Sequence, residues 1–206
     1  MASNGFPLQN LPLSPRTIAL VAAGVALGWG ASLLFRWWRT HRARKRVVQA
    51  VTQTGFESLR DVLVPDGNGG HYHVDFLLLT TRGILVVDLR DVEGIVFGGD
   101  QMTDWTVMNG PSRSTFLNPQ GALYDRVAAV RALSGEVPVE GRIVFTRRSQ
   151  FPKGLPKWTL LIDALKAEFP HPDRASFQGM LERFQQGWQA VKVNTSPSSM
   201  ANPRPL

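Results

Sequence analysis

The stretch HVDFLLLTTRGILVVDLRDVEG, residues 73–94, contains two apolar runs joined by a short turn. The runs FLLL and ILVV have the length and composition of β-strands, and TTRG between them predicts a hairpin. Asp75 precedes the first run, and Asp88-Leu89-Arg90 follows the second. Neither strand needs charges to fold, and a hairpin brings these charged ends close together. We therefore expect a functional site at the open end of the hairpin.

The residue types at this end are suited to binding a cation. Side chains two positions apart in a strand share a face, so Asp88 and Arg90 point the same way, and Asp75 lies beside them. Two carboxylates can hold a hard cation such as Mg²⁺ through oxygen. Such a cation activates water, and a neighbouring cationic group stabilises the negative charge that develops on a phosphate. The spacing indicates a metal site at Asp75 and Asp88, with Arg90 in support.

The composition fits one ordinary globular domain with an attached segment, because the 206 residues are 43% hydrophobic and 19% charged. The absence of cysteine excludes disulfides, thiolate metal sites and cysteine nucleophiles. The net charge of +7 suggests a nucleic-acid partner, but seven of the 23 basic residues lie within residues 16–46, whereas all 16 acids lie from Glu57 onward. The globular part is therefore neutral on balance, and affinity for nucleic acid would require a local patch.

Residues 17–35, TIALVAAGVALGWGASLLF, carry no charge. A helix of this length spans about 30 Å, the thickness of the hydrocarbon core of a bilayer. After Arg36 the chain has Trp37 and Trp38, and tryptophan favours the membrane interface. We predict a transmembrane anchor over residues 17–38, after an N-terminal tail at residues 1–16.

The basic residues follow the apolar run, whereas a cleaved signal peptide carries them in front of it. We therefore expect an uncleaved single-pass anchor, with the N-terminus outside and the domain after it in the cytoplasm. The basic juxtamembrane segment 39–46 is expected to contact anionic membrane lipid. Gly24, Gly28 and Ser32 share one face of the helix, which would allow two helices to approach closely and form a homodimer. The alternative is that these glycines have no role in a dimer, because glycine is common in membrane helices in general.

The rest of the chain alternates between strand and helix patterns, which predicts an α/β sandwich with a mixed central sheet. Asn118 would cap a helix that begins at Pro119 and is closed by Gly135. A last helix at 174–191 carries an aromatic stripe that is typical of packing against a core. Residues 193–206 are poor in apolar residues and rich in proline and serine, which predicts a disordered tail.

The motifs together resemble the NERD (nuclease-related) domain. The resemblance covers residues 47–165, with residues 166–192 as a C-terminal helix. The stretches that carry it are Asp75, LLLTTRGILVVDLRDVEG (77–94), Trp105, FLNP (116–119) and IVFT (143–146).

This resemblance implies a restriction-endonuclease-like fold and a site similar to that of the PD-(D/E)xK nucleases. It implies nucleic acid as the substrate and Mg²⁺ as the cofactor. By the match, Asp75 and Asp88 are the metal ligands and Arg90 takes the place of the catalytic lysine.

Four features depart from the family pattern, and the mildest is Asp88 in place of glutamate, which shortens the side chain but keeps the ligand type. Arg90 replaces lysine, and a guanidinium stays protonated and tends to bind carboxylates through two hydrogen bonds. The first helix, RARKRVVQAV, lacks the acid that the family often has, and Gln120 follows Pro119 earlier than the family glutamine does. Two alternatives remain: a weakened Mg²⁺-dependent nuclease, or an inactive membrane-tethered interaction or scaffold domain in which Asp88 and Arg90 form a closed ion pair.

The segment HYHVD offers a second set of ligands, because His71, His73 and Asp75 alternate and share a strand face. The chain has four histidines in all, fewer than a histidine-rich dinuclear hydrolase needs. We interpret the segment as the exposed start of a strand.

Two further features are interpreted as structural. Trp105 is expected in the core and not as a platform for base stacking. A cluster of basic residues is interpreted as a solvated rim and not as a phosphate-binding patch. This cluster comprises Arg147, Arg148, Lys153 and Lys157.

Overall fold

The computed structural model describes residues 29–32, 34–35, 38, 42, 44–170, 175 and 177–198. The chain divides into two compact units, residues 1–46 and 47–206. In the first unit the described residues are helical, and the Arg42 guanidinium lies 3.6 Å from the centre of the Trp38 ring. None of the described helices is both long and apolar enough to cross a membrane. The predicted anchor falls mostly outside the described residues, as do Gly24 and Gly28. The transmembrane anchor and the homodimer through it therefore stay predictions.

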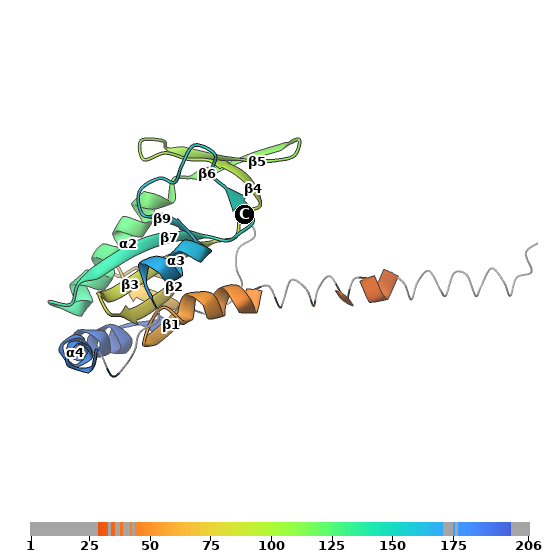
Figure 1. Ribbon diagram of the computed structural model, residues 1–206. Coiled ribbons are helices and arrows are strands. Elements are labelled where there is room, and N and C mark those ends of the chain that lie inside the picture. The colour runs from red at the N-terminus through yellow and green to blue at the C-terminus, as the bar shows by residue number, and fades with distance from the viewer. Residues whose placement is uncertain are drawn as a thin grey trace, which may run out of the picture. The chain divides into compact units, whose positions relative to one another are not determined.

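The second unit contains ten strands and three labelled helices among its described residues (Figure 1). Its first helical segment, residues 47–52, leads into the strands. The strands are β1 (Glu57–Pro65), β2 (His71–Thr80), β3 (Gly83–Arg90), β4 (Gly94–Phe97), β5 (Asp104–Asn109), β6 (Ser112–Leu117), β7 (Val139–Phe145), β8 (Ser149–Gln150), β9 (Thr159–Leu161) and β10 (Ser196–Pro197). The helices are α2 (Pro119–Ser134), α3 (Ile162–Glu168) and α4 (Gln178–Asn194).

Six strands form the main sheet, in the order β10-β1-β2-β3-β7-β9. The predicted hairpin is confirmed, because β2 and β3 pair antiparallel around a two-residue turn. Gly83 ends this turn with φ +118, a backbone conformation that favours glycine. On its other side β3 pairs parallel with β7, so the sheet is mixed. The run ILVV in β3 is buried throughout, as expected for a strand that is covered on both faces.

Helices cover both faces of this sheet and give the α/β sandwich that the alternation of elements predicted. One core contains side chains of α2 and α4, including Leu123, Val130 and Trp188. The other contains side chains of α3 and of the first helical segment, including Leu165 and Val51. The helix over residues 119–134 has the predicted ends, since the Asn118 side chain accepts a hydrogen bond from the Gln120 N–H and Gly135 closes it.

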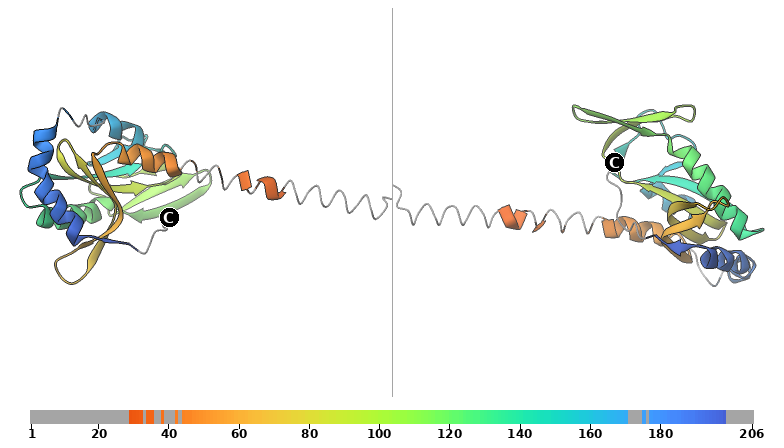
Figure 2. Two further views of the ribbon diagram at one scale, coloured as in Figure 1. Left: turned by 90° about the horizontal axis from the view of Figure 1, so that it is seen from below. Right: turned by 180° about the vertical axis from the view of Figure 1, so that it is seen from behind.

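A second sheet of four strands, β6-β5-β4-β8, lies at the opposite end of this unit from α4 (Figures 1 and 2). It contributes Val96, Trp105 and Val107 to the larger core. Trp105 is fully buried and packs against Phe116 and Phe145, which confirms its predicted place in the core.

The C-terminal boundaries differ from those that the sequence patterns predicted. The last helix runs from Gln178 to Asn194, and α3 spans the expected boundary between 165 and 166. The tail was predicted to be disordered from residue 193, but Ser196–Pro197 pairs with β1. Backbone pairing depends little on side-chain type, so a polar, proline-containing segment can still extend a sheet edge for two residues.

Candidate functional site

The hairpin brings the two predicted carboxylates together. Phe76 pairs with Val87, and the next positions outward are Asp75 and Asp88. The backbone N–H of Leu89 donates a 2.8 Å hydrogen bond to Asp75 Oδ2. The expectation that the charged ends of the two runs meet is therefore confirmed. Their assignment as metal ligands stays a prediction.

Asp88 is buried, with 4% of its side chain exposed, and is held by two arginines. Its Oδ2 accepts a 2.8 Å hydrogen bond from Arg90 and a 3.1 Å hydrogen bond from Arg126. The pair with Arg90 agrees with their predicted common face. Arg126 comes from α2 and also donates to the backbone carbonyl of His73. Sequence spacing could not identify Arg126, because it lies 38 residues from Asp88.

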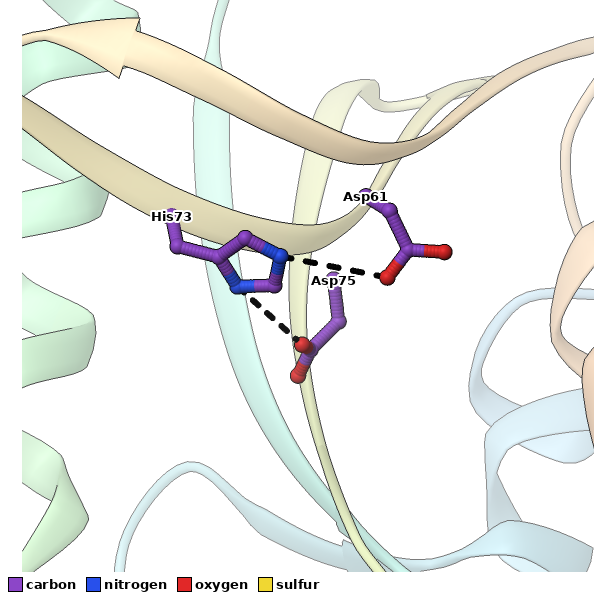
Figure 3. A group of neighbouring side chains, drawn as sticks. All are labelled: Asp61, His73 and Asp75. Carbon is purple, nitrogen blue, oxygen red and sulfur yellow. Dashed lines mark ion pairs between the residues drawn. The ribbon is translucent and has the colours of Figure 1, made fainter. Parts of the chain in front are cut away.

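A second group of side chains lies on the other side of Asp75 (Figure 3). His73 Nε2 is 3.8 Å from Asp61 Oδ1, and His73 Nδ1 is 3.6 Å from Asp75 Oδ1. One ligand atom from each residue lies within 4.8 Å of the others, an arrangement that is compatible with a divalent cation. His71 does not belong to this group, and it is exposed. The sequence patterns missed Asp61, although an acid inside the strand-like run LRDVLV was a visible signal.

Asp61 takes its place through the register of β1. Its neighbours Arg60 and Val62 pair with Phe76 and Val74, so Asp61 lies across from Asp75. The carboxylate-bearing positions 61, 75 and 88 therefore follow one another across three adjacent strands.

The pKa of Asp75 is set mainly by its burial. Burial raises the pKa of the Asp75 carboxyl above its ordinary value, and the negative charge of Asp88 raises it further. The Leu89 N–H, His73 and Arg126 each lower this pKa, but they do not offset the first two effects. The ionised form of Asp75 is therefore less favourable here than in water.

The NPQ segment at the start of α2 has a structural role. Gln120 is buried, and its side-chain amide donates to Asp100 and to the backbone carbonyl of Lys157. The hydrogen bond from Gln120 and one from the Lys157 backbone N–H lower the pKa of Asp100. Gln120 thus ties two loops to the helix N-terminus, and none of its hydrogen bonds reaches Asp75 or Asp88.

Two of the four basic residues of the rim are paired with acids. Arg147 bonds to Asp163, and Arg148 bonds to Asp91 and Glu93. These pairs are exposed, which favours the predicted solvated rim over a phosphate-binding patch.

A mixed sheet between helices is consistent with a nuclease-like α/β sandwich. Residues 39–146 match the family model described as the nuclease-related domain, NERD. This match covers just over half of the chain, so the protein belongs to the NERD family.

A curated relative is an uncharacterized protein of Bacillus anthracis, 25% identical over 89 residues. The aligned segment covers 43% of this chain and 42% of the relative, so the chain matches less than half of the relative's length. No solved structure matches the chain.

Proposed function

We propose that the protein is a membrane-tethered NERD domain in which arginine pairing has disarmed the nuclease centre, leaving an interaction domain. One observation carries the proposal: the same oxygen of Asp88 accepts hydrogen bonds from both Arg90 and Arg126. These bonds already neutralise the carboxylate that the family pattern assigns to Mg²⁺.

The donor set at Asp75 and Asp88 does not fit Mg²⁺. This ion requires near-octahedral oxygen ligands and gains most from carboxylates that carry uncompensated charge. Here one oxygen of Asp75 accepts the Leu89 N–H and one oxygen of Asp88 accepts two guanidinium groups. The charges of the two acids and the two arginines cancel. A cation would have to displace an arginine whose charge is always present.

The membrane part of the proposal rests on the charge-free run 17–35 and the basic residues that follow it. The expected result is that the full chain sediments with membranes and resists extraction by alkaline carbonate. Release into the soluble fraction by carbonate would contradict the anchor. Protease added to intact cells would leave the cytoplasmic domain uncut.

The test of the disarmed centre uses the full chain in detergent micelles, with Mg²⁺ and labelled single-stranded DNA, duplex DNA and RNA. We expect no cleavage by the wild type. Arg90→Lys combined with Arg126→Gln should gain Mg²⁺-dependent cleavage. Adding Asp75→Asn to that double variant should abolish the gain. Arg113→Gln, which changes an exposed arginine of β6, serves as the matched control and should stay inactive.

Two outcomes decide between the alternatives. Cleavage by the wild type that requires Mg²⁺ and is lost in Asp75→Asn would replace the proposal with the weakened nuclease. Inactivity of the folded double variant would show that the arginines are not what prevents hydrolysis.

A further inference from the structure

We infer that Asp61, His73 and Asp75 form a binding site for a transition-metal ion such as Zn²⁺ or Mn²⁺, a site that shares Asp75 with the nuclease pattern but is displaced from Asp88 toward β1. The inference goes beyond the proposed function, because it concerns a cation that Asp88 does not bind. Within the described part of the chain, neither Asp61 nor Asp75 forms an ion pair with an arginine or lysine.

The distances suit one ion. Two ligands that each lie about 2.1 Å from a common metal are separated by at most about 4.2 Å. His73 Nε2 and Asp61 Oδ1 are 3.8 Å apart, which is within this span. The three ligand atoms lie within 4.8 Å of one another, so a contraction of up to about 1.4 Å brings them to the spacing of about 3.4 Å that tetrahedral ligands have.

His73 has an unused nitrogen. Its Nε2 is shielded from solvent and makes no hydrogen bond within the described part of the chain. The two contacts of the ring with carboxylates, at 3.6 and 3.8 Å, are longer than the 2.7–2.9 Å of a charge-assisted hydrogen bond. A shielded polar atom without a partner is costly, and a metal ion between His73 and Asp61 would satisfy it.

The backbone holds Asp61 toward His73 at a local cost. Asp61 has φ +49, an uncommon conformation for a non-glycine residue and one that clusters at functional sites. It breaks the alternation of β1, since Leu59 on one side and Val62 on the other both pack on the same core. Figure 3 shows the Asp61 carboxylate directed at the His73 ring.

The C-terminal segment supports this conformation. β10 pairs with Val62 and Leu63, and the backbone N–H of Ser198 donates a 2.7 Å hydrogen bond to the Asp61 carbonyl. The segment 196–198 therefore fixes the strand at the position of the proposed ligand. Groups that hold a ligand in this way typically change metal affinity by about 10- to 100-fold when they are removed.

The ligand types set the class of metal. An imidazole with two carboxylates suits Zn²⁺ or Mn²⁺, whereas Mg²⁺ prefers oxygen ligands alone. Three protein ligands also leave a coordination position for water.

The test measures binding of Zn²⁺ and of Mg²⁺ to the chelator-stripped full chain in detergent by calorimetry, with Co²⁺ absorption as a second readout. We expect one Zn²⁺ per chain and no heat from Mg²⁺. Asp61→Asn and His73→Asn should each weaken Zn²⁺ binding on the order of 100-fold, at least the effect that supporting groups have. His71→Asn, two positions along the same strand, is the matched control and should bind as the wild type does. Deletion of residues 196–206 should weaken binding about 10-fold.

The variant Asp88→Asn distinguishes this site from the metal site that the sequence predicted at Asp75 and Asp88. Circular dichroism establishes that each variant is folded. Retention of Zn²⁺ binding by Asp88→Asn, with its loss in His73→Asn, supports the displaced site. The opposite pattern overturns the inference in favour of the hairpin acids. If the wild type binds no Zn²⁺, or if His73→Asn binds it unchanged, the inference is also overturned, and His73 acts as an ion-pair partner of the two carboxylates.

Discussion

Asp88 and Asp75 occupy neighbouring positions on paired strands, yet their surroundings are opposite. Asp88 is buried against two guanidinium groups that neutralise it. Asp75 faces another acid and a histidine, and its pKa is raised. The difference arises because α2 places Arg126 over Asp88, whereas Asp75 faces β1 and the Asp61 side chain. Position in a strand therefore does not determine the role of a carboxylate. Its role depends on whether the element packed against it carries a basic side chain, as α2 does, or an acidic one, as β1 does.

Removing the charge of Asp88 should have the largest effect. Asp88→Asn leaves two arginines without a counter-charge. We expect the free energy of unfolding to fall by about 3 kcal/mol. This is the lower end of the range for a broken buried ion pair, because both arginines are partly exposed. Denaturant unfolding measures it. Asp91→Asn is the control, and its exposed pair with Arg148 should contribute less than about 1 kcal/mol. Equal losses in the two variants would mean that burial does not distinguish the two pairs.

Asp75→Asn should have a smaller effect with the opposite sign, measured in chelator. Burial and the negative charge of Asp88 raise the pKa of Asp75, so the ionised carboxylate costs stability at pH values above its ordinary pKa. The variant should therefore have a higher Tm than the wild type. As the pH falls through the raised pKa toward 3.8, folded wild type takes up a proton and the difference should vanish.

Asp163→Asn provides the control for that pH dependence. The hydrogen bond from Arg147 lowers the pKa of Asp163, so ionised Asp163 stabilises the folded state. This stabilisation is present above the ordinary pKa of 3.8 and is lost as the pH falls through the lowered pKa. Near neutral pH, Asp75→Asn should therefore be more stable than the wild type, and Asp163→Asn should be less stable. The same sign for both would contradict the contrast between the two carboxylates. With Zn²⁺ present, the wild type should become more stable than Asp75→Asn, because the variant lacks a proposed metal ligand.

Arg148→Ala should have the smallest effect. Arg148 pairs with Asp91 and Glu93 at an exposed rim, where solvent and salt screen the attraction, so we expect less than about 1 kcal/mol. The effect should shrink further in high salt. A loss as large as that of Asp88→Asn would show that the rim contributes to stability as much as the buried cluster does.

Much of the fold was predictable from local patterns. The hairpin at residues 76–87 follows from two apolar runs and a short turn, and its register alone sets Asp75 beside Asp88. The helix over residues 119–134 follows from its cap, its first proline and its closing glycine. These signals act within a few residues, so a single sequence contains them.

The partners of the acids depended on long-range packing. Arg126 reaches Asp88 only because α2 crosses the sheet, and Asp61 meets His73 only because β1 pairs with β2 and bends at that residue. The pairing of Ser196–Pro197 with β1 joins segments more than 130 residues apart. Local patterns in the sequence were enough to show which acids lie at the end of the hairpin, because register is a local property of a short turn. Which acid is neutralised and which faces a histidine followed from long-range packing, because those contacts depend on where distant elements cross.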